Sequence, residues 1–346
     1  MASLRIQPFD LSFRTAYAQA KELALAQEKV PLATAGSIQV EKRREGRFVY
    51  RYRYDAAGKR SAEYLGPEGA DDTGARAEQA RADIRDAEIL SGYSRDLRKV
   101  GFYSADNSTV VTVASLFNAG IFGKGGVLVG THAFGALLNE IGARAAIPLT
   151  EDVDIARAQP IQVAALPRGG LIALLKQTGL PFHEVPQLKR GAPPTSFKVR
   201  GRKLTVDLLV PAKGVPYRAV PVRELGAHAT GLPHFEYLLK SPGPSVLLGR
   251  DRIVPITVPH AGRFCVHKLA VYSLRGGLGN AKREKDVLQA ALLAAALAQG
   301  QEFLLDEAIH AMDKALRVRV RAGAKRVLGL LGENHPEAAR RIEALI

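Results

Sequence analysis

Two aspartates in the segment TEDVDIA, Asp152 and Asp154, are the residues of this 346-residue chain whose type and spacing best suit chemistry. If the segment is a β-strand, both side chains point to the same side, because side chains alternate along a strand. Two carboxylates held together repel each other and stay ionised at low cost only with a cation between them. Mg²⁺ suits such oxygen ligands and keeps positions open for waters and phosphates. The pair therefore indicates a magnesium site that acts on phosphate groups.

A third carboxylate, Asp207, lies in the apolar segment LTVDLL. On a neighbouring strand it would complete a site for two metal ions, which can activate an attacking hydroxyl and stabilise a leaving oxygen. A D-x-D motif alone occurs by chance in many chains and is then a solvated strand end. The strand-like run VLV before Gly130 and Thr131 favours the metal site, because small residues at a helix N-terminus let backbone N–H groups approach a phosphate.

The strings VLVGTHAFGALL, TEDVDIA and LTVDLL together resemble the active-site signature of the DNA polymerase-β-like nucleotidyltransferase superfamily. The fuller strings GTHAFGA, EDVDIA and FCVHKLAVYSLR resemble a bacterial family of that fold, which is distantly related to toxin and abortive-infection nucleotidyltransferases. The resemblance is strongest over residues 100–290.

This resemblance implies roles for single residues. Gly130 and Thr131 would hold a nucleoside triphosphate (NTP), and Asp152 and Asp154 would bind both Mg²⁺ ions. Asp207 would complete the catalytic metal site and help to activate the acceptor hydroxyl. The 20 residues between Thr131 and Asp152 exceed the spacing in minimal superfamily members, so an additional segment must loop out before the strand.

Basic residues downstream extend the resemblance. Lys268 and Arg275 are seven residues apart and would share a helix face. Superfamily members use a helical lysine behind the triphosphate, so Lys268 is the first candidate to neutralise phosphate charge. Arg275 is expected to assist from the same face, and Lys282 and Lys285 are the second candidates.

Two residues near these motifs have open interpretations. His132, which follows the Gly-Thr pair, could contact the triphosphate or pack at the start of a helix. Asp286 could be a structural ion-pair partner, a favourable charge at a helix N-terminus, or a catalytic group.

The N-terminal segment RFVYRYRYD alternates as a strand does. Tyr50, Tyr52 and Tyr54 would share one face, and Arg51 and Arg53 the other. The following DAAGKR would turn the chain and SAEYLG would return it, which gives a hairpin. Its basic residues could grip a nucleic-acid backbone while the tyrosines stack on bases. Alternatively, the tyrosines are the buried face and the arginines are merely solvated.

The elements expected around these motifs define an α+β fold. Residues 101–215 would form the polymerase-β-like nucleotidyltransferase core, a mixed sheet with flanking helices. Residues 1–100 would supply a helix, the basic hairpin and a long helix, and residues 216–346 a second hairpin and a helical domain. Within the core, Gly130 and Thr131 are expected to form a tight turn between a buried strand and a helix. In the C-terminal part, RGGLGN (275–280) would interrupt the helices.

Composition indicates the partner and the compartment. The chain carries 49 Lys and Arg against 34 Asp and Glu, a formal net charge of +15, which predicts a polyanion as partner or substrate. The single cysteine excludes an internal disulfide and a multi-cysteine zinc cluster and fits a reducing cytoplasm. No secretion signal opens the sequence, and its most apolar run is too short to cross a bilayer. We therefore expect a cytoplasmic protein without a membrane partner.

The expected activity is Mg²⁺-dependent transfer of a nucleoside monophosphate from an NTP to an acceptor hydroxyl, with release of pyrophosphate. The positive charge favours RNA, especially a tRNA 3′ end, as the acceptor. The distant relationship implies a toxin or phage-defence setting with an antitoxin partner. Nucleotidylation of a protein or a small molecule is an alternative. A catalytically silent nucleic-acid-binding module is another, although three aspartates without metal would be an uncompensated cost.

Overall fold

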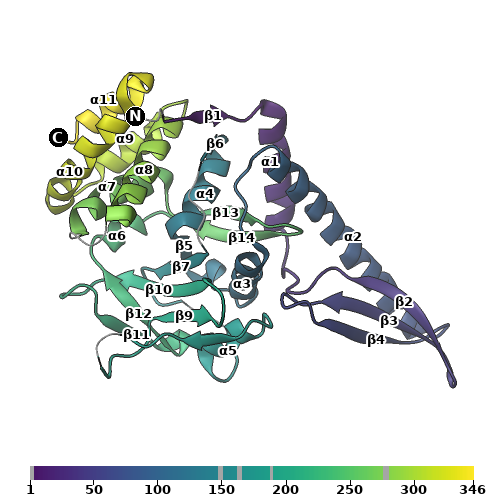
Figure 1. Ribbon diagram of the computed structural model, residues 1–346. Helices are drawn as coiled ribbons and strands as arrows, with labels where there is room; N and C mark the ends of the chain where they lie inside the picture. The colour runs from purple at the N-terminus through teal and green to yellow at the C-terminus, as the bar shows by residue number, and fades with distance from the viewer. Residues whose placement is uncertain (1–3, 147–150, 162–165, 188–189, 276–279) are drawn as a thin grey trace.

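The described part of the chain is organised around a mixed sheet of seven strands, shown in the computed structural model (Figure 1). The structure describes residues 4–146, 151–161, 166–187, 190–275 and 280–346. The strands of this central sheet are β5 (Gly126–Val129), β7 (Asp152–Arg157), β8 (Phe182–Glu184), β9 (Ser196–Val199), β10 (Thr205–Pro211), β11 (Ala219–Val222) and β12 (Ala227–Leu232). A mixed sheet with flanking helices confirms the predicted α+β class.

Strand β10 lies in the middle of the sheet and pairs on both of its edges. On one edge it runs parallel to β7. On the other edge its first half pairs antiparallel with β9 and its second half parallel with β12. Strand β5 runs antiparallel to the far edge of β7. Alternate residues of β7 and β10, such as Val153 and Val206, are fully buried in the core, so the residues between them point to the opposite face.

The helices form two groups (Figure 1). Those near the central sheet are α3 (Asn107–Asn118), α4 (Gly130–Ile141) and α5 (Gly170–Lys176). The C-terminal group comprises α6 (Phe235–Leu238), α7 (Ala261–Leu274), α8 (Asn280–Leu297), α9 (Glu302–His310), α10 (Lys314–Leu331) and α11 (Pro336–Glu343). Helices α8, α9 and α10 all pack against α7, which therefore lies at the centre of this group. Among the helices of the described ranges, none is both long and apolar enough to cross a membrane.

Shorter strands join the N-terminal part of the chain to the core. Strand β1 (Ile6–Pro8) pairs with β6 (Ala143–Ala145), and β13 (Gly243–Leu248) pairs with β14 (Ile253–Val258). The β13–β14 hairpin packs against α1 (Leu11–Leu25) as well as against α3 and α4. The N-terminal helix is thus anchored on the core.

A separate three-stranded antiparallel sheet projects from this body, with a long helix along one side (Figure 1). Its strands are β2 (Ser37–Arg43), β3 (Gly46–Tyr54) and β4 (Arg60–Pro67), and the helix is α2 (Asp71–Lys99). Val49 and Leu65 of the sheet pack against Ala77 and Ala80 of the helix in a small hydrophobic cluster. The sheet therefore has its own minor core.

The structure differs from the sequence-based expectations at three places. The expected basic hairpin has a third strand, β2, whose mostly exposed and polar residues give a weak alternation signal. Gly130 and Thr131 are not a turn but the first residues of α4. The sheet continues beyond residue 215, where we expected the core to end, because β12 runs parallel to the second half of β10. The expected break at RGGLGN lies largely in residues 276–279, outside the described residues.

Candidate active site

Strand register brings the three predicted carboxylates together. In the parallel pairing of β7 with β10, Asp154 lies directly opposite Asp207, and Asp152 lies opposite Thr205. Because Asp152 and Asp154 are two residues apart, all three side chains project from the same face of the sheet. The third carboxylate was therefore predicted on the correct neighbouring strand.

These carboxylates disfavour ionisation of one another. The pKa of Asp154 is raised to about 7, because burial and the charges of Asp207 and Asp152 raise it more than the charges of Lys268 and Lys285 lower it. Burial also raises the pKa of Asp207, whereas a hydrogen bond with Ser196 lowers it. A cation among these oxygens would relieve the repulsion, so the donor set fits a hard divalent ion.

Gly130 is required where α4 begins beside Asp154. Its φ is +70°, in the left-handed region that favours glycine. A Cβ at this position would overlap Oδ2 of Asp154. The helix N-terminus and the carboxylate are therefore in close contact, and a side chain at residue 130 would displace one of them.

Thr131 is buried and connects the start of α4 to α8. Its Oγ1 accepts hydrogen bonds from Nζ of Lys285 at 3.1 Å and from Nε2 of Gln289 at 3.4 Å. Burial lowers the pKa of Lys285, as does the charge of Lys268. The carboxylates Asp154 and Asp152 counteract this effect. Lys285 thus lies between the Gly-Thr motif and the aspartates.

The other basic candidates differ in their surroundings. Lys268 Nζ and Arg275 Nε each lie 2.7 Å from a different carboxylate oxygen of Asp286, which is only 1% exposed. Asp286 is therefore an ion-pair partner of both residues. Lys282 is exposed, and its charge lowers the pKa of Asp207. The charge of Lys268 opposes the rise in the pKa of Asp154 more strongly than that of Lys285 does, so the first candidate and one of the second candidates act on the same carboxylate.

His132 is buried at the start of α4, where its Nδ1 lies 2.6 Å from the hydroxyl of Tyr103. Burial lowers its pKa to about 4, so the ring is neutral at physiological pH. This environment fits the packing role rather than direct contact with a triphosphate.

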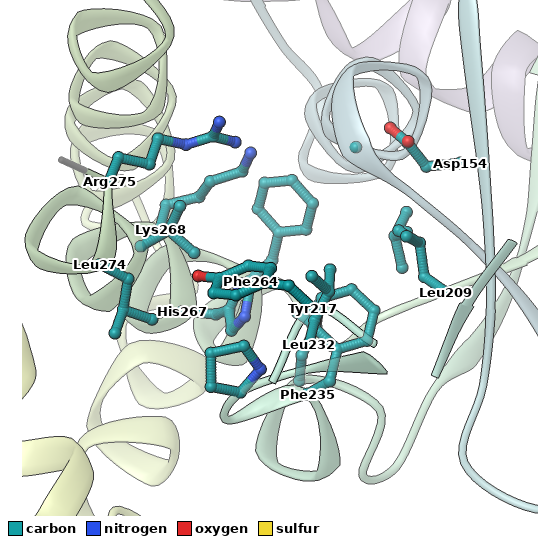
Figure 2. A pocket seen from close by; sticks show the side chains of 15 residues that line it. Asp154, Leu209, Tyr217, Leu232, Phe235, Phe264, His267, Lys268, Leu274 and Arg275 are labelled. Atoms are coloured by element: carbon teal, nitrogen blue, oxygen red, sulfur yellow. The ribbon is translucent and has the colours of Figure 1, made fainter. Parts of the chain in front are cut away.

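A pocket of about 290 Å³ opens between Asp154 and α7. Asp154 and Leu209 lie on one side, Lys268 and Arg275 on the other, and the ring of Phe264 between them (Figure 2). The remaining lining is mostly apolar and includes Tyr217, Leu232, Pro233, Phe235, Leu238, His267, Val271 and Leu274. Sequence reasoning placed several α7 residues on adjoining faces but did not identify this pocket, because Tyr217 and Phe235, the first residue of α6, come from segments distant in sequence.

Within the described residues, no group of three or more His, Cys, Asp or Glu side chains is already positioned to hold a metal ion. The aspartates share a face and a register, but a bound ion would have to draw their oxygens closer. The site is therefore defined by strand geometry rather than by a preformed coordination shell.

An aspartate that faces a lysine and an arginine across a pocket of this size suits an enzyme that handles nucleotide phosphates. A family model described as nucleotidyltransferase matches residues 107–313, which include the Gly-Thr motif, all three aspartates and helices α7 to α9. The chain belongs to this nucleotidyltransferase family. No curated protein and no solved structure is detectably similar to the chain. The match confirms the recognition at family level, whereas the relation to polymerase-β-like enzymes and to toxins stays a prediction.

Proposed function

We propose that this nucleotidyltransferase moves a nucleoside monophosphate from an NTP to an acceptor hydroxyl with the help of two divalent cations. The observation that carries the proposal is the pairing of Asp154 with Asp207 in register, on the face from which Asp152 also projects. The raised pKa of Asp154, to about 7, supports a cation site at these oxygens.

Asp152 and Asp154 would hold both ions, and Asp207 would complete the site nearer the acceptor. When bound, Mg²⁺ would polarise the α-phosphate and help to deprotonate the hydroxyl. The acceptor oxygen would form a bond to the α-phosphorus while the bond from that phosphorus to the β-bridging oxygen breaks. Pyrophosphate would leave, and Asp207 or solvent would accept the hydroxyl proton.

Other residues of the chain would bind the triphosphate. The N-terminus of α4 at Gly130 and Thr131 presents backbone N–H groups that suit phosphate oxygens. Lys285, with Lys268 and Arg275 across the pocket, would neutralise the charge of the β- and γ-phosphates. The apolar lining around Phe264 would receive the nucleoside.

RNA is the acceptor that we propose, because the chain has a formal net charge of +15 and phosphate backbones attract cationic proteins strongly. A toxin or phage-defence setting with an antitoxin partner remains the context implied by sequence resemblance. The same chemistry on a protein or small-molecule hydroxyl would require no change at the carboxylates.

The test is to incubate the purified protein with each α-labelled NTP and Mg²⁺, together with total RNA or a protein extract. We expect label on RNA that disappears in Asp154→Asn and after chelation of Mg²⁺. Asp96→Asn, at an exposed aspartate of α2, is the matched control and should transfer label normally.

Other outcomes would redirect the assignment. Label on protein that depends on Asp154 would identify a protein-modifying enzyme. Label on neither substrate, with nucleic-acid binding unchanged in Asp154→Asn, would favour a catalytically silent binding module. Equal labelling of RNA by wild type and Asp154→Asn would contradict the proposed site.

A further inference from the structure

The two faces of the N-terminal sheet have different surroundings. One face packs against α2, and Arg51 belongs to it. The Arg51 side chain is buried, pairs with Asp83 of α2 at 3.0 Å and donates hydrogen bonds to the carbonyl of Ala35. This arginine is therefore structural, and the sequence-based alternative of a solvated arginine face is wrong for it.

The opposite face of the sheet carries a row of aromatic rings, called the aromatic face below. It consists of Phe48, Tyr50, Tyr52 and Tyr54 of β3 and Tyr64 of β4. Neighbouring ring centroids along the row Phe48–Tyr64–Tyr50–Tyr52 are 6.0, 5.4 and 6.1 Å apart. Tyr64 is 51% and Tyr54 49% exposed, so about half of each large aromatic side chain is open to solvent. Tyr52 is only 8% exposed, so Tyr54 and Tyr64 are the tyrosines of this face that are open to solvent.

Arginines from both flanking strands lie on the same face. The guanidinium of Arg43 lies 4.9 Å from the ring centroid of Tyr50, and that of Arg60 lies 3.8 Å from the centroid of Tyr52. Both arginines are exposed residues. Glu41 accepts hydrogen bonds from Arg43 and from the hydroxyl of Tyr52, so the acidic residue nearest the row already has partners. Arg60 is stacked and open to solvent.

We propose that the aromatic face binds single-stranded RNA, with bases stacked on the exposed tyrosines and phosphates held by Arg60 and Arg43. Residues 37–67 carry eight Lys and Arg against four Asp and Glu, a net charge of +4 that complements a phosphate backbone. Stacking of bases on aromatic rings beside cationic groups is the general mode of binding to single strands. A surface that binds another protein would instead have few charged residues at its centre. The choice of RNA over single-stranded DNA rests on the proposed function.

The aromatic face lies outside residues 107–313, the range matched by the nucleotidyltransferase family model. It would therefore add an acceptor-binding surface to the catalytic part of the chain. Its tyrosines do not touch the carboxylates in the proposed reaction, so binding and transfer can be tested separately.

The experiment measures the fluorescence anisotropy of a labelled oligouridylate of about twelve nucleotides, within the usual site size for single strands. We expect wild type to bind in a salt-dependent manner. Tyr64→Ala should weaken binding about five- to a hundredfold through the loss of one stacked base. Tyr64→Phe keeps the ring and should bind within about twofold of wild type. Arg60→Ala should reduce the slope of log affinity against log salt by about one.

Two variants are matched controls. Phe303→Ala removes an aromatic ring that is 62% exposed on α9, and Arg85→Ala removes an exposed arginine from α2. Both should bind RNA as wild type does. The proposal is overturned if wild type fails to bind the oligonucleotide, or if Tyr64→Ala and Arg60→Ala bind it with unchanged affinity and salt dependence. A Tyr64-dependent complex with a protein in place of RNA also overturns it.

The outcome can be separated from that of the proposed reaction. Asp154→Asn should bind the oligonucleotide as wild type does. Intact, Tyr64-dependent binding without any transfer would refute the reaction and leave the aromatic face supported. Transfer to RNA without Tyr64-dependent binding would refute the aromatic face alone.

Discussion

The aspartates of β7 and β10 and the tyrosines of β3 and β4 are aligned by the same alternation of side chains along strands, but in opposite surroundings. Asp154 lies against Gly130 and opposite Asp207, where backbone register fixes its position. Tyr64 is half exposed on the N-terminal sheet. Among the described elements, α2 is the one that packs closely on this sheet. Changes in the first region should therefore affect catalysis and stability together, whereas changes in the second should affect binding alone.

The sharpest separation of the two regions is expected from Asp154→Asn. Loss of one carboxylate charge at the cation site should reduce nucleotidyl transfer by at least about a thousandfold, roughly 4 kcal/mol of transition-state stabilisation. RNA affinity should not change. Single-turnover rates and fluorescence anisotropy on the same preparation would check this. A parallel loss of RNA binding would show that the aspartates and the tyrosines do not have separate roles.

Asp286→Ala tests the buried ion pairs beside the pocket. Removal of this carboxylate leaves Lys268, whose side chain is 12% exposed, and the more exposed Arg275 without their shared partner. We expect the free energy of unfolding to fall by about 3 kcal/mol, at the low end of the cost for breaking a buried pair because Arg275 reaches solvent. Urea denaturation would measure this. Asp306→Ala, at a 42% exposed partner of Arg341, is the control and should lose less than about 1 kcal/mol.

Gly130→Ala tests the contact between α4 and Asp154. The positive φ alone should cost about 1–3 kcal/mol, and the added methyl group should displace the carboxylate. Transfer should fall by roughly a hundredfold, as expected for a misplaced catalytic group. Gly74→Ala is the matched control, because Gly74 is helical and has open space where a Cβ would stand. Equal thermal stability and activity of the two variants would show that the contact is unimportant.

The smallest effect is expected from Tyr64→Ala on folding. The ring is half exposed, so the free energy of unfolding should change by no more than about 0.5 kcal/mol. Urea denaturation followed by circular dichroism would measure the change. A loss comparable to that of Asp286→Ala would mean that the aromatic face is part of a core, contrary to the comparison.

Spacing rules predicted those features that depend on one strand or one helix. The two-residue spacing of Asp152 and Asp154 placed them on one face, and the alternation of tyrosine and arginine in β3 separated its two faces. Both results follow from local geometry. The strand assignment of Asp207 was also correct, because an isolated aspartate in an apolar strand is conspicuous.

Features that depend on packing between distant segments were not predictable in this way. Lys285 reaches Thr131 only because α8 packs against α4, and Asp286 meets both Lys268 and Arg275 only because α8 packs against α7. Likewise, periodicity within β3 could not reveal which of its faces α2 would cover. Tertiary contacts determine which face of β3 is covered.

The length of α2 has a consequence for substrate selection. A helix of 29 residues is about 43 Å long, and α2 begins beside the projecting sheet and ends against the core, where Ser94 donates a hydrogen bond to the carbonyl of Gly249. An acceptor held by the tyrosines must extend from them to the aspartates. The enzyme would thus select acceptors by length. Very short oligonucleotides, which reach either the tyrosines or the aspartates but not both, should be labelled equally well by wild type and by Tyr64→Ala.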